Sequence, residues 1–187
     1  MKQVAVLMAT GFEEIEAIAT IDILRRADMQ VDMIGLDAMH IRGAHGIEVS
    51  MNDVLENVMD KAYHMVFLPG GMPGAKHLKE DPQVIRFLQK HDEIGAWITA
   101  ICAAPIALHE AGLLEGKNFT CYPSFEEEIL PSGTYTGSIV EMDGRIITGR
   151  GPAAVFEFAY SLVDALGGDS QPLREGMVYN QLLEEKG

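Results

Sequence analysis

The feature that most constrains the fold of this chain is the alternation of short, nearly uninterrupted apolar runs with segments of helical periodicity. A strand covered by helices on both faces is apolar throughout, whereas a half-exposed strand alternates apolar and polar residues. The strand-like runs are Val4–Ala9, Val31–Leu36, Met65–Leu68, Ala96–Ile101, Phe119–Tyr122 and Arg145–Thr148. The helix-like segments are Glu13–Ala27, Pro82–His91, Ala103–Ala111, Phe125–Leu130 and Ala154–Leu166, with a further one after Ser170. This alternation predicts an α/β fold with a doubly wound, mostly parallel sheet and helices on both faces.

Local signals add caps and hairpins to this prediction. Two pairs have the spacing of capping boxes at helix starts: Thr10 with Glu13, and Ser124 with Glu127. The dipeptide Asp143-Gly144 is a strong two-residue hairpin signal, and a weaker hairpin signal lies within Ile41–Val49. We therefore expect two antiparallel hairpins beside the parallel sheet.

Length and charge limit the domain organisation and the partners. The chain has 187 residues, 48% of them hydrophobic, and no Pro/Ser/Gly-rich stretch divides it, so we expect one domain over residues 1–187 with no linker. The net charge is −14, with 28 acidic against 14 basic residues. Because nucleic-acid binding needs a basic face, this balance argues against a nucleic-acid partner.

The first apolar run and the Cys and His content bear on location and metals. Val4–Ala9 is too short for a signal-peptide core or a membrane span, and acidic residues follow it, so we expect a cytoplasmic protein without a membrane segment. Cys102 and Cys121 are the only cysteines, which leaves neither a disulfide framework nor a CxxC-type zinc site. The six histidines share no pattern that would assemble a metal site, and we expect most of them to be exposed.

One cysteine occupies a position typical of a nucleophile. Cys102 lies between the strand-like run Ala96–Ile101 and a helix-like run that begins at Ala103. At such a junction the side chain points out of the sheet, and the N–H groups of the next turn face whatever it attacks. The same N–H groups favour thiolate over thiol. The alternative is that Cys102 is simply a small buried hydrophobe, and position alone does not separate the two interpretations.

A carboxyl far upstream favours the nucleophile. Helical spacing places Glu16 in one row with Phe12, Ala19 and Ile23, a row that is otherwise apolar. A carboxyl on a core-facing stripe is costly unless it is neutralised or hydrogen-bonded, so Glu16 requires a partner. A thiol at the strand ends would supply one.

Glycines follow another predicted strand at the same edge of the sheet. In a doubly wound fold, ligands bind beyond the carboxyl ends of the strands, where Glu16, Gly70-Gly71 and Cys102 all arrive. Paired glycines let the backbone approach a ligand closely, so Gly70 or Gly71 could donate an N–H to an oxyanion. A tight structural turn is the commoner meaning of such a pair.

Four segments in register carry a family resemblance: Gly11–Glu16, Leu68–Gly71, Ala100–Pro105 and Arg150–Pro152. Their order and spacing, over residues 2 to about 168, resemble the ThiJ/PfpI superfamily on its Parkinson's-disease deglycase branch. The resemblance implies a flavodoxin-like fold, commonly dimeric, with an easily oxidised cysteine at the elbow and a protonated glutamate bonded to its sulfur. Those positions are Cys102 and Glu16. By the same match, Gly71 and Ala103 would offer the N–H groups of the oxyanion site.

The chain departs from this pattern at three positions. Many relatives on the branch carry a histidine where this chain has Tyr122, which is a poor general base near neutral pH, so proton transfer would rest on Glu16. The protease-like branch has a histidine at the position of Ala103, and its absence weakens a peptidase interpretation. Some relatives have an arginine near Gly46 that lines an anion pocket. This chain lacks it, although Arg26 and Arg150 remain available as pocket residues.

The resemblance implies a cofactor-independent enzyme that acts on small reactive carbonyls, of glyoxalase or deglycase type. Cys102 would attack the aldehyde carbon and Glu16 would move protons. A second hypothesis is a redox sensor or chaperone-like stress protein in which Cys102 is oxidised to a sulfinate. A thiazole monophosphate biosynthesis role and an amidase or peptidase rank lower. For the homodimer that the family suggests, the first helix offers Ile15, Ile18 and Leu24 as contacts.

Overall fold

A seven-stranded sheet forms the centre of the computed structural model, which describes residues 1–184. Its strand order is β10-β11-β7-β6-β1-β2-β5. The bounds are β1 (Gln3–Met8), β2 (Gln30–Gly35), β5 (Asp53–Val54), β6 (Met65–Leu68), β7 (Trp97–Ile101), β10 (Val140–Asp143) and β11 (Ile146–Gly149). Every neighbouring pair is parallel except β10 and β11. The predicted doubly wound, mostly parallel sheet is confirmed.

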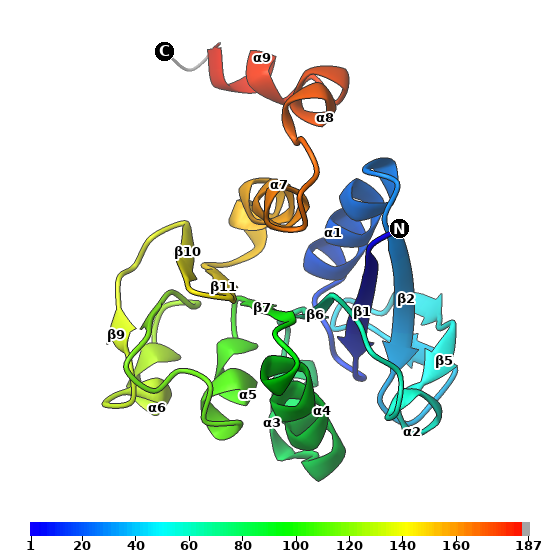
Figure 1. Cartoon of the computed structure of the whole chain (residues 1–187), viewed down its shortest axis with the longest axis vertical. Coiled ribbons are helices and arrows are strands. Elements are labelled where there is room, and N and C mark those ends of the chain that lie inside the picture. Colours follow the sequence, from blue (N-terminus) through cyan, green and yellow to red (C-terminus); the bar gives the residue numbers. More distant parts are fainter. Residues whose placement is uncertain (185–187) are drawn as a thin grey trace.

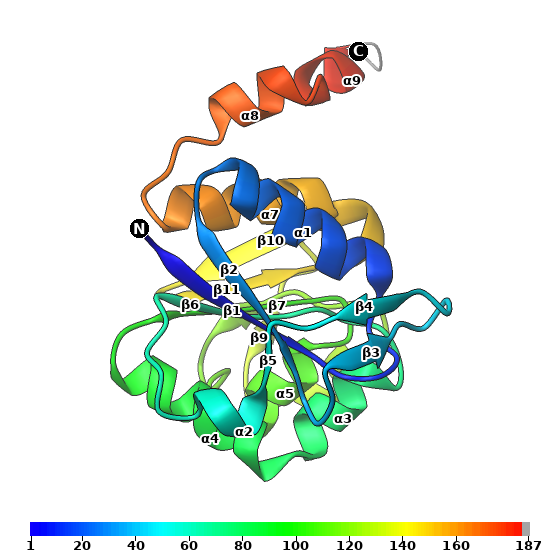
Figure 2. The same cartoon turned by 90° about the vertical axis from the view of Figure 1, so that its right-hand side faces the viewer.

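Helices cover both faces of the sheet (Figures 1 and 2). On one face α1 (Glu14–Arg26) packs against α7 (Val155–Ala165), which follows a 3₁₀ turn at Pro152–Ala154. The other face carries α2 (Leu55–Val58), α3 (Gly74–Glu80), α4 (Pro82–Glu93) and α5 (Pro105–Glu110), with α6 (Glu126–Ile129) beside α5. The central strands are apolar and buried because they are covered on both sides.

The last two described helices lie beyond α7, away from the sheet (Figure 2). They are α8 (Gln171–Gly176) and α9 (Tyr179–Glu184). Arg174 of α8 forms a two-pronged ion pair with Glu157 of α7, with N–O distances of 3.0 and 2.8 Å. Tyr179 also donates to Glu157, at 2.9 Å. These contacts hold the C-terminal helices against the outer side of α7.

Both predicted hairpins are present. Asp143-Gly144 turns β10 into β11, with Asp143 paired to Ile146. The second hairpin joins β3 (His40–Arg42) to β4 (Glu48–Ser50) and stands apart from the central sheet. The described residues also contain a small sheet of β8 (Asn118–Phe119) with β9 (Thr134–Tyr135).

The prediction of a strand over Phe119–Tyr122 is wrong beyond its first residue. The N–H of Thr120 donates to the Thr148 side chain at 2.9 Å, and the N–H of Tyr122 donates to the carbonyl of Cys102 at 2.8 Å. The N–H groups of Thr120 and Tyr122 therefore each make an isolated hydrogen bond and do not belong to the hydrogen-bond ladder of a strand. Pro123 then turns the chain away.

Both predicted capping boxes are also wrong. Helix α1 begins at Glu14, and no side chain caps it, because the preceding residues form a turn in which Gly11 has a φ of +90°. Helix α6 has Phe125 at its N-cap position, also without a side-chain bond, and Ser124 has a φ of +82°. A side-chain cap does occur at α4, where Asp81 accepts from the N–H groups of the first turn.

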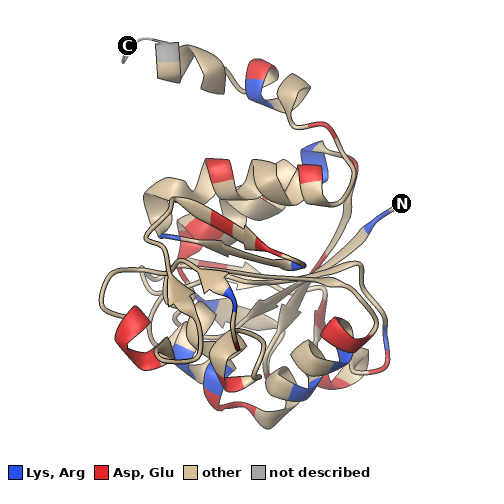
Figure 3. Cartoon of the chain, turned by 60° about the vertical axis from the view of Figure 1, so that its left-hand side comes forward, with Lys and Arg blue, Asp and Glu red and all other residues tan. Residues whose placement is uncertain are grey.

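Charged residues of both signs are interspersed over the elements in the view of Figure 3. Among residues 1–184, none of the helices combines the length and the apolar character that crossing a bilayer would require.

Candidate active site

Three loops meet beyond the carboxyl ends of β1, β6 and β7. Strand β1 leads to α1 on one side, and the chain then continues to β2, whereas β6 and β7 lie on the other side of β1. The strand order therefore reverses at β1, which is where doubly wound sheets bind ligands. Glu16 follows β1, Gly70 and Gly71 follow β6, and Cys102 follows β7. The structure brings these predicted residues together.

Cys102 occupies a strained elbow. Its φ is +63°, a left-handed conformation that is rare for residues with a side chain. Its N–H donates to the carbonyl of Gly149 at 2.9 Å, and its own carbonyl accepts from Tyr122 at 2.8 Å. The two neighbouring segments thus hold the backbone in this conformation from both sides. Sequence reasoning did not identify Gly149 as an anchor, because its contribution is a backbone carbonyl.

Glu16 lies one turn into α1 and is completely buried. Its Oε2 accepts a hydrogen bond from the N–H of Gly70 at 2.8 Å. Its Oε1 is buried and has no hydrogen-bond partner among the described residues. The carboxyl group as a whole contacts the Cys102 thiol. Burial raises the pKa of Glu16 to about 7, against the lowering contributions of the Cys102 and Gly70 contacts. The contact between the Glu16 carboxyl and the Cys102 thiol is the pairing that the sequence predicted.

Gly70 lies between the Glu16 carboxyl and the Cys102 side chain. A Cβ atom at this position would come within 2.6 Å of both the Cys102 Cβ and the Glu16 Oε2. Only glycine lets the carboxyl and the thiol approach each other here. The expectation that Gly70 could donate to an oxyanion is wrong, because its N–H is already bonded to Glu16.

Two other amides point at the sulfur. The N–H groups of Gly71 and Ala103 both lie within hydrogen-bonding reach of the Cys102 thiol and lower its pKa. Neither amide has a backbone acceptor among the described residues. Gly71 has a φ of +87°, and a Cβ there would lie 2.3 Å from the Glu13 nitrogen. The two donors are therefore fixed by the turns that follow β6 and β7.

These amides do not by themselves make the cysteine a thiolate. Burial raises the pKa of the Cys102 thiol, and the negative charge of Glu16 raises it further, more than the Gly71 and Ala103 amides lower it. The amides do favour thiolate, as expected, but their effect on the thiol pKa is smaller than that of burial and of the Glu16 charge. Removing both protons from the pair is unfavourable, because two negative charges would share a buried site. The Glu16 carboxyl, with its pKa raised to about 7, is therefore the group that loses a proton near neutral pH, whereas the thiol, with its own pKa raised, keeps its proton.

Of the two arginines predicted near the pocket, Arg150 lines a pocket and Arg26 does not. Arg150 lines a pocket together with Tyr122, and its guanidinium donates to the carbonyl of Gly137. Arg26 is exposed at the far end of α1, about 15 Å along the helix from Glu16, where it pairs with Asp22 at 2.7 Å. The assignment of Arg26 to the pocket is wrong, because its position on α1 directs it to solvent.

His45 contacts carboxyl groups near the site. Its Nδ1 lies 3.0 Å from Glu14 and 3.5 Å from Glu13, and these three residues form a group that could hold a metal ion. However, Glu14 also accepts the N–H groups of His45 and Ile47, so it already fastens the β3–β4 hairpin to α1.

The other histidines lie away from the thiol. His91 is fully buried, which contradicts the expected exposure, because its ring bonds the Phe87 carbonyl and the Tyr63 N–H. His40 and His64 are exposed, and His77 and His109 are half-buried.

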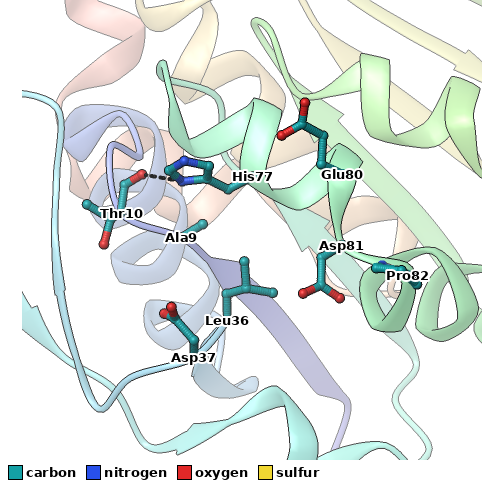
Figure 4. A pocket seen from close by; sticks show the side chains of 8 residues that line it. All are labelled: Ala9, Thr10, Leu36, Asp37, His77, Glu80, Asp81 and Pro82. Atoms are coloured by element: carbon teal, nitrogen blue, oxygen red, sulfur yellow. Dashed lines mark hydrogen bonds between the residues drawn. The ribbon is translucent and has the colours of Figure 1, made fainter.

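A second pocket, of about 470 Å³, opens at the ends of β1 and β2 (Figure 4). His77 bonds the Thr10 carbonyl there at 3.2 Å, and Asp37, Glu80 and Asp81 lie around it. Its lining contains neither Cys102 nor Glu16, and no hydrogen bond joins its lining residues to the Cys102 backbone.

The chain is similar to known proteins over most of its length. The model of the DJ-1/PfpI family matches residues 2–165. Protein dj-1beta of Drosophila melanogaster is 34% identical to the chain, over 89% of this chain and 90% of its own length. A Caenorhabditis elegans protein named glutathione-independent glyoxalase is 33% identical, over 83% of each chain. DJ-1 homolog B of Arabidopsis thaliana is 40% identical. The chain spans about two fifths of the lengths of the two Arabidopsis relatives it matches.

Solved structures show the same fold. The crystal structure of Drosophila melanogaster DJ-1beta has a TM-score of 0.92 at 32% identity and covers 95% of this chain and 97% of its own. A mutant of a DJ-1 superfamily protein from Salmonella typhimurium has a TM-score of 0.90 at 36% identity, over 97% of this chain and 98% of its own. The flavodoxin-like fold expected from the sequence is confirmed.

Proposed function

The chain belongs to the DJ-1/PfpI family, and we propose that it is a cysteine-dependent enzyme acting on small reactive carbonyls, of glyoxalase or deglycase type and independent of added cofactor. The observation that carries the proposal is the buried contact of Glu16 with Cys102, beneath two amides that face the sulfur. A nucleophile, a proton carrier and two oxyanion donors are what addition to an aldehyde requires. The relative named as a glyoxalase supports this substrate class.

The proposed reaction adds one water to a 2-oxoaldehyde and needs no external oxidant or reductant. The Cys102 sulfur attacks the aldehyde carbon, a C–S bond forms, and the carbonyl oxygen takes the thiol proton by way of Glu16. A proton then moves from the former aldehyde carbon to the ketone carbon, and the hemithioacetal hydroxyl proton passes to the ketone oxygen, so that the ketone becomes an alcohol and the former aldehyde carbon becomes a thioester carbonyl. Water cleaves the resulting thioester to a carboxylate and restores the thiol. The aldehyde carbon is oxidised by two electrons and the ketone carbon is reduced by two.

The Glu16 pKa suits this role. A group that takes and returns protons works best when its pKa is near the operating pH. Burial has moved the Glu16 pKa to about 7, so both protonation states are accessible near neutrality. When Glu16 is protonated, its charge no longer opposes ionisation of Cys102, and the sulfur becomes easier to activate.

A redox sensor or chaperone-like stress protein is the second candidate. The same two amides and the protonated Glu16 would hold the oxygens of a Cys102 sulfinate. A sensor reacts once per oxidation event, whereas an enzyme turns over. An amidase or peptidase is less favoured, because Ala103 stands where a Cys-His pair would need a histidine. For a thiazole monophosphate role the chain offers no Gly-rich phosphate loop of the expected type.

We also propose a homodimer and a cytoplasmic location. Ile15, Ile18 and Ile47 are 49%, 40% and 56% exposed and line one apolar surface between α1 and the β3–β4 hairpin. Exposed apolar surfaces of this kind are typical of interfaces between subunits. Leu24, which we expected in this interface, is fully buried in the core of its own subunit. Both cysteines are unpaired, as is usual in reducing compartments.

The experiment that tests the enzyme is multiple-turnover conversion of methylglyoxal to lactate, with chiral product analysis in a buffer free of thiols and amines. The Cys102→Ser variant should lose turnover, whereas Cys121→Ser, which changes the other buried thiol, should retain it. Stereoselective, Cys102-dependent lactate supports the enzyme. A single stoichiometric modification of Cys102 without product refutes the enzyme and favours the sensor.

A further inference from the structure

A pocket of about 240 Å³ opens beside the Cys102 elbow and has mostly apolar walls. Tyr122 forms one wall, Ile139 and Gly151 form another, and the 3₁₀ turn at Pro152–Ala154 closes the end. A cavity of about 150 Å³ can hold a benzene molecule, so this pocket has room for a six-membered ring. Methylglyoxal would leave most of it empty.

The pocket walls are bonded directly to the nucleophile's backbone. The Tyr122 N–H donates to the Cys102 carbonyl at 2.8 Å, and the Cys102 N–H donates to Gly149, the residue before Arg150, at 2.9 Å. Cys102 itself does not line the pocket, but Tyr122 and the segment that leads into Arg150 and Gly151 lie directly beside its backbone. A group attached to a carbonyl under attack by Cys102 can extend toward it.

Contacts within the protein hold the walls of this pocket in place. The N–H of Arg150 donates to the Ile139 carbonyl at 3.0 Å, and the Arg150 guanidinium donates to Gly137, so this arginine fixes the loop that carries Ile139. A Cβ at Gly151 would lie 3.2 Å from the Tyr122 ring, so the ring packs closely on the glycine backbone. Phe125 meets the same ring edge-on, with centroids 6.4 Å apart. A preformed pocket loses little free energy to ordering when it binds.

Tyr122 and Ile139 nevertheless remain exposed, at 46% and 55%. A pocket lined by an aromatic ring and an aliphatic side chain is suited to binding a flat apolar group. We propose that this pocket receives the non-reacting substituent of the carbonyl substrate and selects aryl 2-oxoaldehydes over methylglyoxal, with Tyr122 as the specificity-determining residue. This inference rests on the proposed carbonyl chemistry at Cys102.

The test compares kcat/KM for phenylglyoxal and methylglyoxal in wild type, Tyr122→Ala and Tyr122→Phe. Phenylglyoxal is intrinsically more electrophilic, but this difference is the same for every variant, so the informative quantity is the change in the ratio between variants. The ratio should fall about tenfold in Tyr122→Ala, the effect of one lost aromatic contact with its apolar surface, and be restored in Tyr122→Phe. Substitution keeps the residue's backbone N–H, so the bond to Cys102 can persist.

Met142→Ala is the control variant, because Met142 is 48% exposed on β10 and does not line the pocket. It should leave the ratio unchanged. A ratio that does not move in Tyr122→Ala, or that falls equally in Met142→Ala, overturns the proposal.

A second measurement does not need turnover. Cys102 is alkylated under pseudo-first-order conditions with 2-bromoacetophenone or bromoacetone. A C–S bond forms, bromide leaves with the C–Br electron pair, and the thiol proton passes to the buffer. The ratio of the two rates should again fall about tenfold in Tyr122→Ala. If neither aldehyde is turned over but this ratio falls, the proposed enzyme is wrong and the pocket stands. If turnover occurs and neither ratio changes, the pocket assignment is wrong.

Discussion

The N–H of Gly70 donates to Glu16 Oε2 at 2.8 Å and thereby settles which carboxyl oxygen can carry a proton. An oxygen that accepts a backbone N–H is the better place for negative charge. The proton of the neutral acid is therefore expected on Oε1, which has no other well-formed hydrogen bond among the described residues. The Gly70 amide thus leaves Oε1 as the oxygen that donates when Glu16 is neutral.

Replacing Glu16 by glutamine should slow aldehyde turnover by roughly a hundredfold, because the amide can donate a hydrogen bond but cannot transfer a proton. Steady-state rates with methylglyoxal check this. Glu13→Gln, at the start of the same helix, is the matched control and should change the rate far less, since Glu13 affects Glu16 only through its charge. Equal rates for Glu16→Gln and wild type would remove Glu16 from the mechanism.

Stability should depend on pH through Glu16. Its pKa is about 7 in the folded protein against 4.5 for an ordinary glutamate, so between these values the folded state holds the proton more tightly. The free energy of unfolding should therefore fall as pH rises from about 4.5 to about 7, by up to roughly 3 kcal/mol. Urea unfolding at several pH values measures this. Glu16→Gln should flatten the curve in that window, and an identical slope in both proteins would contradict the assignment.

Gly70→Ala should abolish activity, because the added Cβ would lie 2.6 Å from both the thiol-bearing Cβ and Glu16 Oε2. The Glu16 and Cys102 side chains must then separate. Gly176→Ala is the matched control, since a Cβ there meets nothing within 4 Å. Turnover and the rate of Cys102 alkylation should both fall for Gly70→Ala only, and a fully active Gly70→Ala variant would show that the close approach is not needed.

The proposed dimer should dissociate when Ile15 is replaced by aspartate, because a charge would be buried in an apolar interface. Sedimentation at micromolar concentration should show a dimer for wild type and a monomer for Ile15→Asp. Ile94→Asp is the control, since Ile94 is comparably exposed, at 54%, but lies outside the α1 surface. A wild-type protein that sediments as a monomer would refute the dimer.

The sequence predicted that Glu16 and Cys102 lie close together, although they are far apart along the chain. This proximity follows from the helical spacing of apolar residues and from the topology of a parallel sheet. Glu16 stands on an apolar helical row, and Cys102 and Gly70-Gly71 stand at strand ends, so a parallel sheet necessarily brings them to one edge. Uninterrupted apolar runs likewise identified the central strands.

Features that depend on neighbours in space could not be predicted. The capping boxes failed because Gly11 and Ser124 adopt left-handed backbone conformations, set by tertiary contacts, just where the helices would begin. Leu24 was expected at a subunit interface but lies in the core, and Arg26 was expected at the pocket but lies in solvent. Residues two apart on a helix point in different directions, so each must be placed by its own neighbours in space. The Cys102 pKa was misjudged because burial and the Glu16 charge outweigh the backbone amides.

The left-handed backbone at Cys102 also has a consequence for selection. Glycine adopts this conformation without steric cost, whereas a residue with a side chain loses roughly 1 kcal/mol. Cys102→Gly should therefore be more stable than Cys102→Ala by about that amount in thermal or urea unfolding, although both lack the thiol. A lineage selected for durability alone would settle on glycine at this position. On the proposed function, the reactive thiol is kept at this position at a cost of roughly 1 kcal/mol of folding stability.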